Sequence, residues 1–86
     1  MYSIHIKKKA EKQLAALPLN VANRIVAVID GLATNPRPAS NTKLQGYTNV
    51  YRIRIGNYRI IYSVEDAILM IEVIKIGHRQ SVYRRL

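Results

Sequence analysis

Three arginines near the middle of the chain, Arg52, Arg54 and Arg59, have the chemistry and the spacing of a phosphate site. They lie in a segment that alternates apolar and polar residues on both sides of Gly56-Asn57, and a two-residue turn that begins with glycine is typical of a type II′ β-hairpin. If the strands pair symmetrically about this turn, Arg54 lies directly opposite Arg59. Like charges in opposed positions destabilise a sheet, whereas guanidinium groups bind phosphate oxygens bidentately. The pattern therefore favours a phosphate-binding role.

The same pairing gives the hairpin two different faces. Since successive side chains of a strand point to opposite sides, one face carries Tyr51, Ile53, Ile55, Tyr58, Ile60 and Tyr62. The other side carries Arg52, Arg54 and Arg59, and we call it the arginine face. We expect the apolar face to pack on helices and the arginine face to stay open.

Other kinds of site have little support in the sequence. There is no cysteine, no Gly-rich phosphate loop and no carboxylate cluster beside either histidine, His5 or His78. We therefore expect no metal and no cofactor, and no nucleophile motif indicates a Ser-His-Asp triad. What remains is a cationic site, for which the candidate residues are Arg52, Arg54, Arg59, His78, Arg79 and Tyr83.

A cationic site of this kind can cleave RNA without a metal, because RNA supplies its own nucleophile, the 2′-hydroxyl. Positioning that hydroxyl in line with the phosphate and stabilising the added negative charge accelerates the reaction. His78 has an unperturbed pKa near neutrality and would transfer protons, provided that it reaches the arginine face from the end of the last strand. Tyr83 would stack on a base or shuttle a proton.

Each candidate also has a purely structural alternative. Arg52 and Arg54 could be the solvent face of an edge strand, where charges prevent aggregation. Arg59 could be tied to Glu72, and His78 could be an ordinary surface residue. Tyr83 could anchor the C-terminal segment by packing.

Composition and charge narrow the class of protein. The chain has 86 residues, which predicts one domain over residues 1–86, and its 49% hydrophobic content is that of an ordered domain. The formal net charge of +9 is typical of a nucleic-acid binder, although an acidic protein partner would also explain it. No apolar run is long enough to cross a membrane and no signal peptide begins the chain, so a cytoplasmic protein is expected.

The hydrophobic spacing predicts an α+β domain. A strand over residues 2–6 precedes two helices, over residues 7–17 and 21–32, which form an antiparallel pair. A weak strand over residues 43–47, the hairpin over residues 50–62 and a long apolar strand over residues 67–76 follow. The order predicts one mainly antiparallel sheet, with three to four strands after the helices and the helices on one face. Pairing Val64 with Ala67 would place Glu72 opposite Arg59.

These segments together resemble the RelE/ParE superfamily of toxins from prokaryotic toxin–antitoxin pairs. The resemblance covers nearly the whole chain and rests on Lys8–Leu14, Lys43–Gly46, Tyr51–Arg54, Tyr58–Tyr62, Ile76–Arg79 and Val82–Arg84. It implies the RelE-like fold and, for the RelE branch, an endonuclease that cuts mRNA in the ribosomal A site. It also implies catalytic roles for Arg52, Arg54, Arg59, Arg79 and Tyr83.

The resemblance further implies two partners: the ribosome with its mRNA, and an antitoxin that wraps the toxin and represses their shared operon. Contact with operon DNA would occur only through the antitoxin, and an acidic antitoxin would suit the basic surface. We expect the phosphates of RNA to be bound by Arg52, Arg54, Arg84, Arg85 and Lys43.

One departure from the RelE pattern concerns proton transfer. The best-known members have lysine where this chain has Arg52 and Arg54, and arginine does not lose its proton in proteins. His78 is therefore the candidate base, unless the enzyme relies on electrostatic stabilisation alone. Two other functions remain open: a ParE-type toxin that poisons DNA gyrase by protein contact, and a non-catalytic module that only binds RNA or the ribosome.

Overall fold

Segments whose apolar residues alternate form strands, and segments whose apolar residues have helical spacing form helices. The structure is a computed structural model and describes residues 1–78. In chain order the elements are β1 (Ser3–Ile6), α1 (Lys8–Ala15), α2 (Leu19–Leu32), β2 (Asn41–Lys43), β3 (Val50–Ile55), β4 (Tyr58–Glu65), the 3₁₀ turn η1 (Asp66–Ile68) and β5 (Met70–His78). The expected α+β class and the helix pair are confirmed, and four strands follow the helices, the upper end of the expected number.

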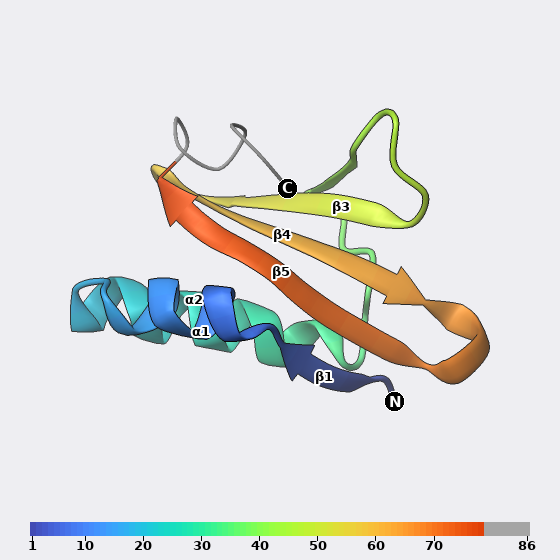
Figure 1. Ribbon diagram of the computed structural model, residues 1–86, viewed down its shortest axis with the longest axis horizontal. Coiled ribbons are helices and arrows are strands. Elements are labelled where there is room, and N and C mark those ends of the chain that lie inside the picture. Colours follow the sequence, from blue (N-terminus) through green and yellow to red (C-terminus); the bar gives the residue numbers. More distant parts are fainter. Residues whose placement is uncertain (79–86) are drawn as a thin grey trace.

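The strands form one sheet in the order β1-β5-β4-β3-β2. β1 runs parallel to β5, and all other neighbours are antiparallel. The two helices lie on one side of the sheet (Figure 1). No helix within residues 1–78 is long and apolar enough to cross a membrane.

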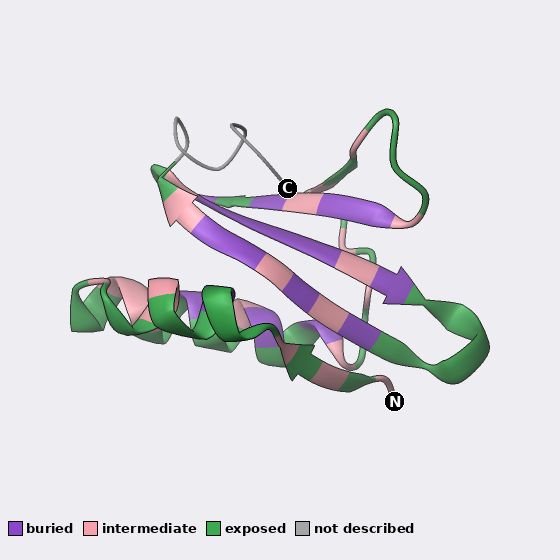
Figure 2. Cartoon of the chain, in the orientation of Figure 1, coloured by how far each residue is buried: buried purple, intermediate pink, exposed green. Residues whose placement is uncertain are grey.

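The main core lies between the sheet and the helices. Ala10 of α1 and three side chains of α2, those of Ile25, Ile29 and Leu32, pack against the apolar sides of β3, β4 and β5. Figure 2 shows this as buried stretches on the three strands and on α2. α1 also completes the edge of β5, because the side-chain Oε1 of Gln13 accepts a hydrogen bond from the backbone N–H of Ile76 at 2.9 Å. The helices thus leave the other side of the sheet as the surface for a site.

The β3–β4 hairpin has the predicted register. Ile55 pairs with Tyr58, and Arg54 pairs with Arg59. Gly56 has a φ of +57°, the left-handed conformation that a type II′ turn requires at its first position. The turn chemistry and the alternation thus fixed the same pairing.

The predicted register of the last strand is wrong. β5 begins at Met70, because η1 and the left-handed Leu69 (φ +50°) occupy the connection that the sequence analysis assigned to a tight turn. A β-bulge follows, since Ile61 pairs with Lys75 while Tyr62 pairs with Val73. Consequently Gly77, and not Glu72, lies opposite Arg59.

Candidate functional site

The arginine face is built from two neighbouring rows of side chains that cross β3, β4 and β5. Arg54 pairs with Arg59, and Arg59 with Gly77, which gives the first row. Arg52 pairs with Ile61, and Ile61 with Lys75, which gives the second. Paired residues of adjacent strands point to the same side of a sheet, so Lys75 projects from the same face as the three arginines.

The three arginines differ in their surroundings. Arg54 is exposed near the hairpin turn, and Arg52 is half-buried, with its Nη2 donating a hydrogen bond to Thr42 Oγ1 at 3.2 Å. Arg59, on the central strand β4, is only 5% exposed. The expectation of an open arginine face is therefore wrong for Arg59. A buried guanidinium interacts more strongly with a phosphate than an exposed one, because less water screens it.

A small apolar cluster adjoins the two rows. Val50 and the fully buried Ile61 pack with Leu44 and Ile74 on this side of the sheet. The cluster packs around Ile61 in the middle of the second row, and it therefore holds the backbone that carries Arg52 and Lys75 in place.

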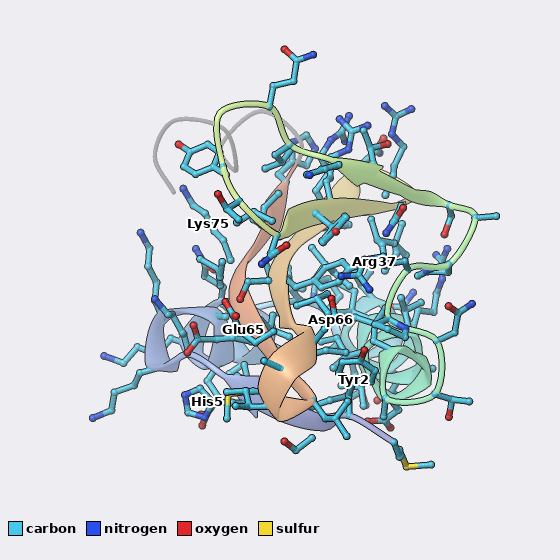
Figure 3. The ribbon with its side chains drawn as sticks, turned by 90° about the vertical axis from the view of Figure 1, so that its right-hand side faces the viewer. Tyr2, His5, Arg37, Glu65, Asp66 and Lys75 are labelled. Carbon is cyan, nitrogen blue, oxygen red and sulfur yellow. The ribbon has the colours of Figure 1, made fainter. Side chains whose placement is uncertain are left out.

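Lys75 was not predicted as a site residue. It is 7% exposed, and Figure 3 shows it on the opposite side of β5 from the group formed by Tyr2, Arg37 and Asp66. Burial lowers the pKa of the Lys75 ammonium, and the positive charge of Lys9 lowers it further. The sequence carried a signal, since Lys75 is a single charge between Ile74 and Ile76 in an apolar strand, but the alternation without a bulge assigned it to the core side.

His78 lies on the other face of the sheet from Arg59. It pairs with Tyr58, whose side chain belongs to the apolar face, and the two rings meet edge to face with centroids 5.8 Å apart. The histidine is exposed at the end of β5. The expectation that His78 reaches the arginine face is therefore not met in this structure.

Lys43 also projects from the other face. It pairs with Tyr51, whereas its neighbour Thr42 pairs with Arg52 and takes the place on the arginine face. The strand comprises Asn41–Lys43 and not residues 43–47, and this shift of the strand decides the side on which Lys43 lies. Four predicted site residues lie outside the described residues, namely Arg79, Tyr83, Arg84 and Arg85.

A polar cluster joins four distant parts of the chain on the helix side of the sheet. Arg37 donates hydrogen bonds to the Asp66 carboxylate from Nη2 (2.7 Å) and Nη1 (3.2 Å), and its Nε donates to the Tyr51 hydroxyl (2.9 Å). The hydroxyl of Tyr2 donates to Asp66 Oδ1 at 2.5 Å. Hydrogen bonds from Arg37, and then from Tyr2, lower the pKa of Asp66. This cluster ties the α2–β2 connection to the start of β3 and to η1, and it is structural.

The two rows can bind and polarise a phosphodiester. Two guanidinium groups stand opposite each other, a third stands one row away, and a buried ammonium completes the second row. No group of three His, Asp or Glu residues within residues 1–78 is arranged to hold a metal ion. The chemistry that the face supports is the stabilisation of negative charge on a phosphate together with proton transfer by an amine.

Comparison with known proteins identifies related sequences over nearly the whole chain. The family model described as the ParE toxin of the type II toxin–antitoxin system parDE matches residues 4–83. The putative toxin RelE1 of Methanocaldococcus jannaschii is 34% identical, and the match covers 96% of each chain. The toxin RelE of Mycobacterium tuberculosis is 29% identical over 96% of this chain and 87% of its own.

Solved structures agree with these matches. The toxin in the archaeal RelE–RelB complex from Pyrococcus horikoshii superposes with a TM-score of 0.82 at 32% identity, and the match covers 94% of this chain and 98% of that one. The isolated RelE toxin of E. coli superposes with a TM-score of 0.81 at 26% identity, over 91% and 84% of the two chains.

Proposed function

This chain belongs to the RelE/ParE superfamily of toxins from type II toxin–antitoxin systems, and on that premise we propose that it is a ribosome-dependent mRNA endonuclease. The toxin role follows from the family. The cleavage reaction is the step that the arginine face supports, and it would take place in the cytoplasm, where mRNA is translated.

The opposed pair Arg54 and Arg59 is the observation that carries the proposal. Two like charges in directly paired positions cost stability, and the burial of Arg59 adds to that cost. A phosphate bound by both Arg54 and Arg59 would turn the repulsion into attraction, because both guanidinium groups would then face an anion. This arrangement favours a ligand with phosphate groups over a face that serves the fold alone.

In the proposed reaction the 2′-oxygen of a ribose attacks the adjacent phosphorus. A bond forms between the 2′-oxygen and phosphorus, and the bond between phosphorus and the 5′-oxygen breaks. The 2′-hydroxyl loses its proton, the 5′-oxygen gains one, and the products are a 2′,3′-cyclic phosphate and a 5′-hydroxyl. Arg52, Arg54 and Arg59 would stabilise the extra charge on the phosphate as it develops. Roles for Arg79 and Tyr83 remain part of the proposal and rest on the resemblance.

Two macromolecular partners belong to the proposal. The ribosome would hold the mRNA in the in-line geometry, because orientation supplies much of the acceleration of such a reaction. An acidic antitoxin would bind and inhibit this chain, as the solved complexes of RelE with RelB from other organisms suggest by analogy. Any contact with operon DNA would pass through that antitoxin.

The test uses ribosomes programmed with a defined mRNA and an empty A site. Purified protein, separated from its antitoxin, is added, and new 5′ ends are mapped and their chemistry determined. Arg59→Ala is compared with Arg24→Ala, a matched control that removes an exposed arginine of α2. We expect an A-site cut with a 2′,3′-cyclic end, which disappears with Arg59→Ala and persists with Arg24→Ala.

Absence of a cut by folded parent protein would overturn the nuclease proposal. A ParE-type activity is the second candidate, because the family model that matches bears the ParE name. In that case the parent would inhibit DNA gyrase in a supercoiling assay. Binding to ribosomes without cleavage or gyrase inhibition would favour the third possibility, a non-catalytic module.

A further inference from the structure

Lys75 reaches the arginine face because of the β-bulge in β5. Bulges redirect the side chains that follow them, and Ile74 is the extra residue between the pairs Tyr62–Val73 and Ile61–Lys75. Lys75 lies diagonally across from Arg59 on the neighbouring strand. Such diagonal neighbours lie about 7–8 Å apart, so a phosphate bound by Arg59 is within reach of a lysine side chain.

Among the described residues, the positive charge of Lys9 from α1 acts on Lys75. Arg52 from β3 and Arg59 from β4 carry like charges on the same face of the sheet as Lys75. On its own strand, the carboxylate of Glu72 lies 3.9 Å from His5 Nε2 and 4.0 Å from Lys7 Nζ, toward β1. Burial and Lys9 both favour the neutral amine, and this is why the pKa of Lys75 is lowered. A neutral amine accepts protons, which a guanidinium does not do.

We propose that Lys75 is the general base of the cleavage reaction, taking the proton of the ribose 2′-hydroxyl while Arg52, Arg54 and Arg59 hold the scissile phosphate. This inference rests on the proposed nuclease function. Lys75 would supply the proton acceptor that Arg52 and Arg54 do not provide.

The proton of the 2′-hydroxyl passes through Lys75 to solvent during the reaction. The amine Nζ of Lys75 takes the 2′-hydroxyl proton as the 2′-oxygen forms its bond to phosphorus. The bond from phosphorus to the 5′-oxygen breaks, and the 5′-oxygen takes a proton from solvent water. The Lys75 ammonium then returns its proton to solvent, so that the enzyme is regenerated.

His78 is less suited to this role in the described structure. Its ring packs against Tyr58 on the apolar side of the sheet, whereas Lys75 shares a face with the phosphate-binding arginines. We therefore expect opposite effects on the cleavage rate when each of the two side chains is removed. Removing the Lys75 amine stops cleavage, and removing the His78 ring leaves the rate nearly unchanged.

The deciding experiment measures single-turnover cleavage on programmed ribosomes over a range of pH. Lys75→Arg is the sharpest variant, because it keeps the positive charge and removes the ability to accept a proton. Lys75→Met keeps the aliphatic chain and removes the nitrogen. Lys12→Met is the matched control, since Lys12 is an exposed lysine of α1 that has no place on the arginine face. His78→Ala is measured beside them.

We expect Lys75→Arg and Lys75→Met to lower the rate by about 10²- to 10⁴-fold, the usual contribution of a general base, without weakening binding to programmed ribosomes. The parent rate should rise with pH and level off above the pKa of Lys75, and this rise should be absent in Lys75→Met. Lys12→Met and His78→Ala should keep the parent profile.

A parent-like rate and pH profile for Lys75→Arg would overturn the inference and leave the nuclease function standing. Loss of ribosome binding in both Lys75 variants, with an unchanged pH profile, would assign Lys75 to RNA binding and also overturn it. If the parent makes no cut, the proposed function and this inference fall together. Should Lys75→Met fail to fold, Lys75→Arg and the pH profile of the parent still decide the question.

Discussion

Replacing Arg54 with threonine should stabilise the protein while it removes activity. Arg54 is exposed and lies directly opposite Arg59. Charged pairs in directly opposed cross-strand positions change stability by about 0.2–1 kcal/mol, and like charges lower it. Threonine is well suited to a strand, so we expect a gain of about 0.5 kcal/mol. In a domain of this size that raises the Tm by about 2–4 °C.

Thermal unfolding of parent and variant at low salt and at about 1 M salt provides the assay, because salt at that concentration screens charges beyond about 3 Å. The gain should shrink at high salt. Arg52→Thr is the matched control, on the same strand and face but opposite Ile61. It should bring no gain, because it removes the hydrogen bond to Thr42 and relieves no directly opposed like-charge pair. A Tm increase that is equal in both variants, or equal at both salt concentrations, would refute the electrostatic reasoning.

Three further predictions concern the fold. Arg37→Ala should destabilise the protein at neutral pH, because the lowered pKa of Asp66 stabilises the folded state only while its carboxylate is charged. The loss of stability should therefore fade below about pH 4, the usual Asp pKa. A loss that does not change with pH in urea unfolding would contradict this. Leu69→Gly should raise the unfolding free energy by up to about 1 kcal/mol, since Leu69 is exposed with a φ of +50°, and an unchanged Tm would speak against strain there. Ile60→Ala, in the fully buried centre of β4, should cost about 2–5 kcal/mol in chemical denaturation, and Ile60→Val only about 0.5–1.5.

The hairpin could be predicted from the sequence because two independent signals agreed. The Gly56-Asn57 turn fixes which residues are adjacent, and the alternation fixes which side is buried. Both signals are local, so no distant contact was needed to place Arg54 opposite Arg59. The arginine part of the candidate site was predictable for the same reason.

The last strand could not be predicted in the same way. Its start depends on η1 and on Leu69 in a conformation that leucine rarely adopts, and its second half depends on a bulge. The longer connection shifted the pairing by an even number of residues, which leaves the faces unchanged. The bulge added one residue and exchanged the faces beyond Ile74, which brought Lys75 to the arginine side and left His78 beside Tyr58.

The position of β5 in the sheet has a consequence for the synthesis of the protein. β5 lies between β1 and β4 but follows them both along the chain, and Ser3 pairs with Met70. The hairpin of β3 and β4 can form on a growing chain, whereas β1 has no partner strand until β5 has been made. Closing so long a loop is entropically costly and comes late. The sheet of a nascent copy is therefore completed only after most of the chain, Lys75 included, has left the ribosome.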